Sequence, residues 1–372
     1  MFKTESSLKK LLIVYILWIA FSAFSSSLVY LYFKDAGVQE SDLVASFLFS
    51  TVSCVILIAL LNKRKTDFRK LMTGGIFLIA LSYLLLAFLS PTRELLFLYS
   101  AITGLNFFLF WVPFNIMYFE FSHAKAALFG SFYFSLTSLA MMSMPLLSGF
   151  IGENFGFDYL FITAAVLYML LTLPVYLLGK REYRYELKDT LSDTKGFRTL
   201  IFVEGVYFGG MMAALAVIPL FYFEKPMEMG FYLSITTVFS VIASLIVSSL
   251  SDRSRKRVFY IRIFGAGLVL TSIASSLATT MGTWYAAVSA RNLFSTLFMP
   301  FTTAIIIDAK KDIDDVMVGR EFILNMGRIL GIAAVLLCTL FLTIHSSLVF
   351  LGLAILLYPV LIEFKRKHIT VS

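Results

Sequence analysis

Charge, cysteine and histidine are all scarce in this chain of 372 residues. Only 15% of the residues are charged and 59% are hydrophobic, a composition that excludes an ordinary soluble globular domain. The two cysteines, Cys54 and Cys338, both fall inside apolar segments, which excludes a disulfide framework. The three histidines are not spaced as metal ligands, and no Gly-x-x-x-x-Gly-Lys-[Ser/Thr] loop occurs. The sequence therefore predicts no metal, no cofactor, no enzyme and no direct use of ATP.

What the chain has instead is a series of long apolar runs that contain few charges or none. Each run has about 20 residues or more, enough to cross the roughly 30 Å core of a bilayer as a helix. In the first half of the chain they cover 11–33, 43–62, 71–90, 95–119, 127–151 and 159–179. In the second half they cover 199–223, 230–250, 258–278, 283–308, 321–343 and 346–364. We predict an all-α membrane protein with 12 transmembrane helices.

Positive charge lies mainly in the short segments between these runs. The segment 251–257 reads Ser-Asp-Arg-Ser-Arg-Lys-Arg, and a looser copy occupies 62–70. With both termini in the cytoplasm, most of the 31 Lys and Arg fall on the cytoplasmic side, as the positive-inside rule requires. In this assignment Arg320 belongs to the cytoplasmic segment 310–320. The net charge of +8 then indicates topology, and we expect no nucleic-acid partner.

The chain also shows signs of an internal repeat. Its longest polar interruption, 180–198, separates two sets of six runs, and the motif around Pro113 is echoed around Pro300. We expect both prolines to loosen their helices. The sequence predicts an N-terminal six-helix bundle over 1–179, a cytoplasmic linker over 180–198 and a C-terminal six-helix bundle over 199–372.

Motifs in the loops point to one family. The stretch 250–257 keeps a Leu-x-Asp-Arg core followed by cations, and helix five keeps Pro145 and Gly149 of a longer small-residue pattern that permits close helix packing. With this layout the chain resembles the major facilitator superfamily over essentially its whole length. The resemblance implies a 6+6 fold, alternating access, and hairpins that act as gates. The gating candidates are Asp252, Arg253 and Arg257 in the second half, and Asn62, Lys63 and Asp67 in the first.

Three charges inside the predicted helices are functional candidates, because charge in a bilayer is costly. Arg291 either binds an anionic or hydrogen-bonding substrate through its planar fork or serves as a structural partner for carbonyl groups or a tyrosine. Glu204 and Arg328 lie at similar depth, so they are able to pair. Such a pair either takes up and releases a proton during the cycle or is a static ion pair.

Polar and aromatic residues on the helices expected to face a central cavity complete the set. Each is a candidate substrate contact, although packing is the commoner role for any one of them. They are Trp18 on helix one, Asn106, Trp111, Asn115 and Tyr118 on helix four, Tyr207 on helix seven and Asn292 on helix ten.

The resemblance and these residues together favour a secondary transporter that moves a small organic solute across the cell membrane. We favour proton-coupled export, with an uptake permease for a polar or anionic metabolite as the alternative. A non-transporting accessory protein or lipid scramblase is the alternative from another class. The expected partners are a small-molecule substrate, protons and the lipid bilayer, and we expect a monomer.

Overall fold

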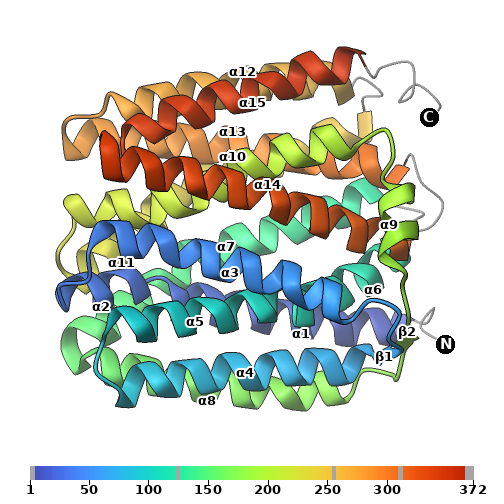
Figure 1. Cartoon of the computed structure of the whole chain (residues 1–372), viewed down its shortest axis with the longest axis horizontal. Helices are drawn as coiled ribbons and strands as arrows, with labels where there is room; N and C mark the ends of the chain where they lie inside the picture. The colour runs from blue at the N-terminus through green and yellow to red at the C-terminus, as the bar shows by residue number, and fades with distance from the viewer. Residues whose placement is uncertain (1–4, 123–125, 254–256, 309–312, 365–372) are drawn as a thin grey trace.

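Long helices run roughly along one axis, with a two-stranded sheet and the short helix α9 at one end, in the computed structural model of the protein (Figure 1). The structure describes residues 5–122, 126–253, 257–308 and 313–364. We call the end that carries α9 the linker end and the opposite end the far end. Helix α1 begins and α15 finishes at the linker end (Figure 1).

The first half of the chain contains α1 (Glu5–Ser26), α2 (Val29–Asp35), α3 (Glu40–Leu60), β1 (Thr66–Asp67), α4 (Phe68–Phe88), α5 (Arg93–Asn106), a π-helical turn (Phe107–Trp111), α6 (Val112–Ser122), α7 (Ala126–Phe155) and α8 (Phe157–Tyr176). The second half contains β2 (Glu182–Tyr183), α9 (Leu187–Asp193), α10 (Arg198–Val217), a 3₁₀ turn (Ile218–Phe221), α11 (Pro226–Arg253), α12 (Arg257–Ser276), α13 (Met281–Asp308), α14 (Ile313–Phe341) and α15 (Ser346–Phe364).

The prediction of a multi-pass helical membrane protein is confirmed. Among the described residues, 11 helical segments are long and apolar enough to cross a membrane. Helix α13, where the tenth crossing is expected, has 28 residues but is not one of the 11. It carries Arg291 and Asn292 near its middle. The count of 12 crossings and the cytoplasmic placement of the termini stay predictions.

Two of the expected helices are interrupted. The run 11–33 divides into α1 and α2 at a turn near Ser27, where two serines bond back to carbonyl oxygens of the preceding turn. Ser26 Oγ donates to the Ser22 carbonyl at 2.7 Å, and Ser27 Oγ donates to the Phe24 carbonyl at 3.1 Å. In helix four the π-helical turn lies immediately before Pro113, which has no N–H to donate. Pro300, by contrast, lies within the continuous helix α13.

Helices of the two halves pack side by side along two seams, α7 against α11 and α3 against α14. Glycine allows the closest approaches. A Cβ added at Gly230 on α11 would lie 2.3 Å from the carbonyl oxygen of Pro145 on α7, and one at Gly149 would lie 2.7 Å from that of Pro226. The small-residue spacing of helix five therefore serves close helix packing, as the sequence predicts.

The same packing rule gives a first prediction, on stability. A Cβ at Gly104 on α5 would lie 1.9 Å from the carbonyl oxygen of Ser50 on α3, and backbone on both sides cannot yield easily. We expect Gly104→Ala to lower the free energy of unfolding by about 1–3 kcal/mol, the usual cost of overpacking. Thermal unfolding of the detergent-purified protein measures the effect.

Gly74→Ala is the matched control, because a Cβ at Gly74 on α4 meets nothing within 4 Å. There the higher helix propensity of alanine is expected to add about 0.5–1 kcal/mol. Equal melting temperatures for the two variants would contradict the close α3–α5 contact.

Candidate functional site

An ion pair in the interior joins α10 to α14 about two turns from the linker end. Arg320 Nη2 donates to Glu204 Oε1 at 2.5 Å, and the Glu204 and Arg320 side chains are only 1% and 13% exposed. Two atoms of the pair, Glu204 Oε2 and Arg320 Nε, are buried without a hydrogen-bond partner among the described residues. The carboxylate thus keeps one free oxygen, which is where a proton can add.

A second ion pair extends the first along α14. Arg328 Nη1 donates to Glu321 Oε1 at 2.9 Å and to Asn325 Oδ1 at 3.1 Å, and Asn325 Nδ2 donates to Glu321 Oε1 at 2.8 Å. The three residues are spaced by four and three positions, which puts them on one face of the helix. We call Glu204, Arg320, Glu321 and Arg328 the charge network.

The charge network reaches the first half of the chain through that face of α14. The guanidinium carbon of Arg328 lies 5.6 Å from the ring centre of Phe107 in the π-helical turn. Asn325 Nδ2 lies 3.5 Å from the sulfur of Cys54 on α3. A change of charge in the network therefore acts on a seam between the two halves.

The network corrects one prediction from the sequence. Glu204 pairs with Arg320, whereas the sequence suggested Arg328 as its partner, and Arg328 pairs with Glu321 instead. The sequence predicts Arg320 in the cytoplasmic segment 310–320, because the apolar run begins only after it. Helix α14 begins at Ile313 and carries Arg320 about two turns into the bundle. The available signal was the spacing of Arg320 and Arg328, which lie two turns apart on one helix.

A separate buried cation lies near the middle of α13. Arg291 is 6% exposed, and its guanidinium carbon lies 5.8 Å from the ring centre of Tyr207. Arg291 Nη1 donates to Asn292 Oδ1 at 3.1 Å, while Nε is buried without a partner among the described residues. Asn292 in turn donates to the Thr236 carbonyl on α11 at 3.2 Å. Both contacts of Arg291 are with uncharged groups.

Aromatic side chains gather in the first half around the predicted cavity residues. The Trp18 ring stacks on Phe110 and meets Trp111 edge-on, with ring centres 6.1 Å apart in the second contact. Tyr133 on α7 lies against Trp111 and Tyr118. Its hydroxyl donates to Asn115 Oδ1 at 3.3 Å. The structure thus brings together four of the predicted residues, Trp18, Trp111, Asn115 and Tyr118. Tyr133, within electrostatic range of Arg320 and Glu321, connects this cluster to the charge network.

Two predicted cavity residues contact helices of their own half, and their predicted role in the cavity stays a prediction. The amide oxygen of Asn106 lies 2.7 Å from where a Cβ on Gly75 of α4 would be. The hydroxyl of Tyr207 is 3.1 Å from Ser272 Oγ on α12, so only its ring is left to meet Arg291. Sequence alone could not assign these faces, because in a membrane both faces of a helix are apolar.

The predicted linker is structured, and it binds the first-half hairpin. Strands β1 and β2 pair antiparallel, with Thr66 opposite Tyr183 and Asp67 opposite Glu182. Asp67 Oδ1 accepts from the backbone N–H of Arg69 at 3.0 Å and so caps the start of α4. We call residues 180–198 the linker strap.

The other two predicted hairpin residues also contact the strap. Asn62 Oδ1 accepts from the backbone N–H of Leu187 at 2.9 Å, and Lys63 Nζ pairs with Glu186 at 2.8 Å. The hydrogen bond from Lys63 holds the pKa of Glu186 below its usual range. The Lys63–Glu186 pair therefore stabilises the fold at neutral pH, and this stabilisation is lost as the pH falls through the lowered pKa of Glu186.

The strap touches the second half as well. Tyr183 Oη donates to Asp315 Oδ1 on α14 at 2.8 Å. A Cβ at Gly319 on α14 would lie 2.3 Å from the Thr190 carbonyl oxygen, so α9 lies directly on the helix. The strap thus holds the first-half hairpin and α14 together at the linker end. The second-half hairpin residues Asp252, Arg253 and Arg257 have side chains outside the described part of the structure, and their gating role stays a prediction.

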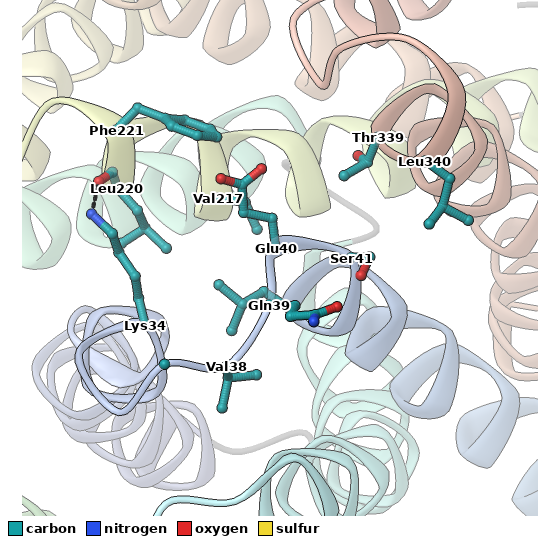
Figure 2. Close-up of a pocket in the computed structure, with 12 residues that line it drawn as sticks. Lys34, Val38, Gln39, Glu40, Ser41, Val217, Leu220, Phe221, Thr339 and Leu340 are labelled. Carbon is teal, nitrogen blue, oxygen red and sulfur yellow. Dashed lines mark hydrogen bonds between the residues drawn. The ribbon is translucent and has the colours of Figure 1, made fainter.

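At the far end, a pocket of about 480 Å³ lies between the α2–α3 turn and the ends of α10 and α14. Figure 2 shows the Lys34 side chain reaching from α2 to the carbonyl oxygen of Leu220, to which its Nζ donates. The carbonyl end of a helix favours a cation. This contact between the halves was not foreseen from the sequence, where Lys34 is only a loop charge.

The fold and the buried charges define a multi-pass helical membrane protein with fixed ionic groups in its interior, the arrangement used by solute carriers. The sequence profile of the Major Facilitator Superfamily matches residues 10–312, and the chain belongs to this family. The family resemblance noted from the sequence is therefore confirmed.

Solved structures agree on the fold. A POT family transporter in complex with 5-aminolevulinic acid is similar with a TM-score of 0.74 and 12% identity, covering 99% of this chain and 98% of that one. The E. coli fucose:proton symporter FucP gives a TM-score of 0.69 and 14% identity, with 98% and 99% covered. No curated protein matches the chain.

The buried pair gives a second prediction, tested by a double-mutant cycle. Glu204→Gln or Arg320→Gln alone leaves an unpaired buried charge and is expected to cost about 3–5 kcal/mol of unfolding free energy. The double variant removes both charges and is expected to recover most of that loss. Chemical or thermal unfolding in detergent is the measurement.

The exposed pair of Arg262 with Glu363, both side chains nearly half exposed, is the control for the cycle. Arg262→Gln should cost about 1 kcal/mol or less. Additive losses in the Glu204–Arg320 cycle would show that the two side chains do not depend on each other.

The strap gives a third prediction. Tyr183→Phe removes one hydrogen bond to α14, worth about 1 kcal/mol, and is expected to speed opening of the α3–α14 seam by about fivefold. Maleimide labelling of Cys54, which is 1% exposed beside Asn325, reports that opening in a Cys338→Ser background. Tyr222→Phe, which loses a hydroxyl bond to Ala278 at the far end, is the matched control. An unchanged rate in Tyr183→Phe would contradict a holding role for the strap.

Proposed function

We propose that this protein is a proton-coupled secondary transporter that moves a small organic solute by alternating access. The observation that carries the proposal is the buried Glu204–Arg320 pair with its free carboxylate oxygen. A static structural pair normally satisfies its hydrogen-bonding groups, because each orphaned polar atom costs stability. The free oxygen of Glu204 is a position at which the pair would accept a proton without breaking its bond to Arg320.

Protonation of Glu204 would change the balance of charge on α14. With Glu204 neutral, Arg320 loses its counter-ion inside the bilayer and favours any state in which it meets water or another acid. On the same helix, Asn325 contacts α3 and Arg328 contacts the π-helical turn. A movement of Arg320 would therefore change the stability of the contacts between the halves. A proton thereby shifts the equilibrium between two states by its differential effect on them.

The moving bodies in this proposal are the predicted halves, 1–179 and 199–372, with 180–198 between them. Contacts at the two ends would alternate. The linker strap and the gating residues Asp252, Arg253 and Arg257 would stabilise closure at the linker end, and Lys34 on Leu220 would stabilise closure at the far end. We further propose that the protein works as a monomer in the cell membrane, with the linker end in the cytoplasm.

Proton coupling serves either direction of transport. If the proton and the solute bind together the protein is a symporter, which suits uptake of a polar metabolite. If they compete it is an exporter, a second candidate that the aromatic cluster around Trp18 and Trp111 favours, since flat apolar surfaces bind lipophilic compounds. The similar fold of a fucose:proton symporter supports coupling to protons.

A fourth prediction tests the proposal in liposomes that contain the purified protein and a trapped pH dye. A panel of amino acids, 5-aminolevulinic acid, sugars, short peptides and lipophilic cations is added outside. We expect at least one solute to drive proton movement, inward with uptake for a symporter and outward for an exporter. Glu204→Gln, which mimics the protonated acid, should lose the proton movement. It should keep exchange of labelled solute for unlabelled solute in a symporter and lose that exchange in an exporter, where proton and solute compete.

Arg262→Gln, with its exposed pair, should behave as the wild type. Proton movement that persists in Glu204→Gln would remove Glu204 from the coupling step. A wild-type preparation that exchanges no solute at all would favour the non-transporting membrane protein.

A further inference from the structure

Arg291 is the cation of the described interior that no carboxylate balances. Arg320 and Arg328 each form an ion pair with a glutamate. Arg291 contacts Asn292 and the face of Tyr207, and among the described residues no acid pairs with it. The charge network is therefore neutral as a whole, and Arg291 leaves the interior with one positive charge.

The depth of Arg291 makes this imbalance costly. It lies ten residues from the far-end start of α13 at Met281, or about 15 Å at 1.5 Å per residue, which is the middle of a bilayer core. Its side chain is 6% exposed, so it cannot reach the headgroups. A cation at such a depth without an internal counter-ion indicates a functional site, at which an anionic ligand binds and dissociates.

The guanidinium is also held in position. Asn292 accepts from Nη1 and is itself anchored to the Thr236 carbonyl on α11. The Tyr207 ring beneath the guanidinium is anchored through its hydroxyl to Ser272 on α12. Three neighbouring helices therefore fix the plane of the fork before any ligand arrives, and such preorganisation raises affinity.

One edge of the fork makes no hydrogen bond among the described residues. Nη1 is engaged by Asn292, whereas Nε has no partner and Nη2 makes no described bond. The Nε and Nη2 hydrogens point in parallel, and their spacing matches the two oxygens of a carboxylate. A sugar hydroxyl or a lipophilic cation offers no such match.

From these observations we infer that Arg291 binds a carboxylate group of the transported solute, with Asn292 and Tyr207 as positioning residues. This inference rests on the proposed transport function and names its substrate class. Binding replaces the missing counter-ion, so the solute neutralises the interior in the state that carries it. The charge network keeps its separate task of taking up the proton.

The test measures ligand-dependent melting in detergent, with no membrane and no pH gradient, so it is independent of proton coupling. Benzoate and succinate are the probes, and benzamide and succinamide are their uncharged counterparts. We expect the carboxylates to raise the melting temperature of the wild type with increasing concentration and the amides to have no effect. In Arg291→Gln the affinity for the carboxylates should fall about 10- to 100-fold.

Asn292→Asp is the sharper variant, because it supplies an internal counter-ion of nearly the same size. We expect this variant to lose the stabilisation by carboxylates, and its ligand-free melting temperature also reflects the loss of the amide bond to the Thr236 carbonyl. Arg291→Lys keeps the charge without the fork and should bind carboxylates more weakly than the wild type. Arg262→Gln should keep the wild-type response.

Two results would overturn the inference. One is carboxylate stabilisation that is unchanged in Arg291→Gln and Asn292→Asp. The other is a wild type that no carboxylate stabilises, together with a ligand-free Arg291→Gln that melts several degrees lower, which would assign Arg291 to packing. A protein that binds carboxylates at Arg291 but moves no protons would uphold this inference and reject proton coupling.

Discussion

The constraint on which the structure depends is that Glu204, which is buried from solvent, must meet Arg320 in the interior of the helix bundle. An unpaired charge in such a medium is very unfavourable, and a paired one is tolerated only if the two side chains are held close. Close helix packing holds them. Gly205, next to Glu204, lies under the Leu324 carbonyl of α14, and Arg328 occupies the space beside Gly209 where a side chain would otherwise be. The glycines of α10 thus set the distance at which the charges of the two helices interact.

Helix α14 connects the Glu204–Arg320 pair to the first half of the chain. The face of α14 that carries Glu321, Asn325 and Arg328 is the face that meets α3 and the π-helical turn. Polar contacts also join the halves at both ends, through the linker strap and through Lys34. Each of these is a contact that a rocking motion would make or break, which is how small local energies bias a large movement.

Much of the fold could be predicted from the sequence, because a bilayer imposes simple rules. Long apolar runs predict the helices, and basic loops predict which helix ends face the cytoplasm. The errors arose where local chemistry overrides those rules. The first run is divided at a turn near Ser27, and α14 begins at Ile313, so that Arg320 lies inside the helix and outside its apolar run. The structure of the linker strap could not be predicted, because a polar segment of that length has the composition of a flexible linker. Its strand forms only by pairing with β1, which is distant in the sequence.

The site was harder to predict, because helix faces are not encoded by polarity when lipid and core are both apolar. Trp111 and Asn115 could be grouped from their spacing, but Asn106 on the same helix turns to α4. Infrared difference spectroscopy on the reconstituted protein during a pH jump tests the central claim most directly, because a carboxylic acid that gains a proton adds a C=O stretching band. The account predicts a band that is absent in Glu204→Gln and present in Arg262→Gln. A spectrum that is the same in Glu204→Gln as in the wild type would contradict it.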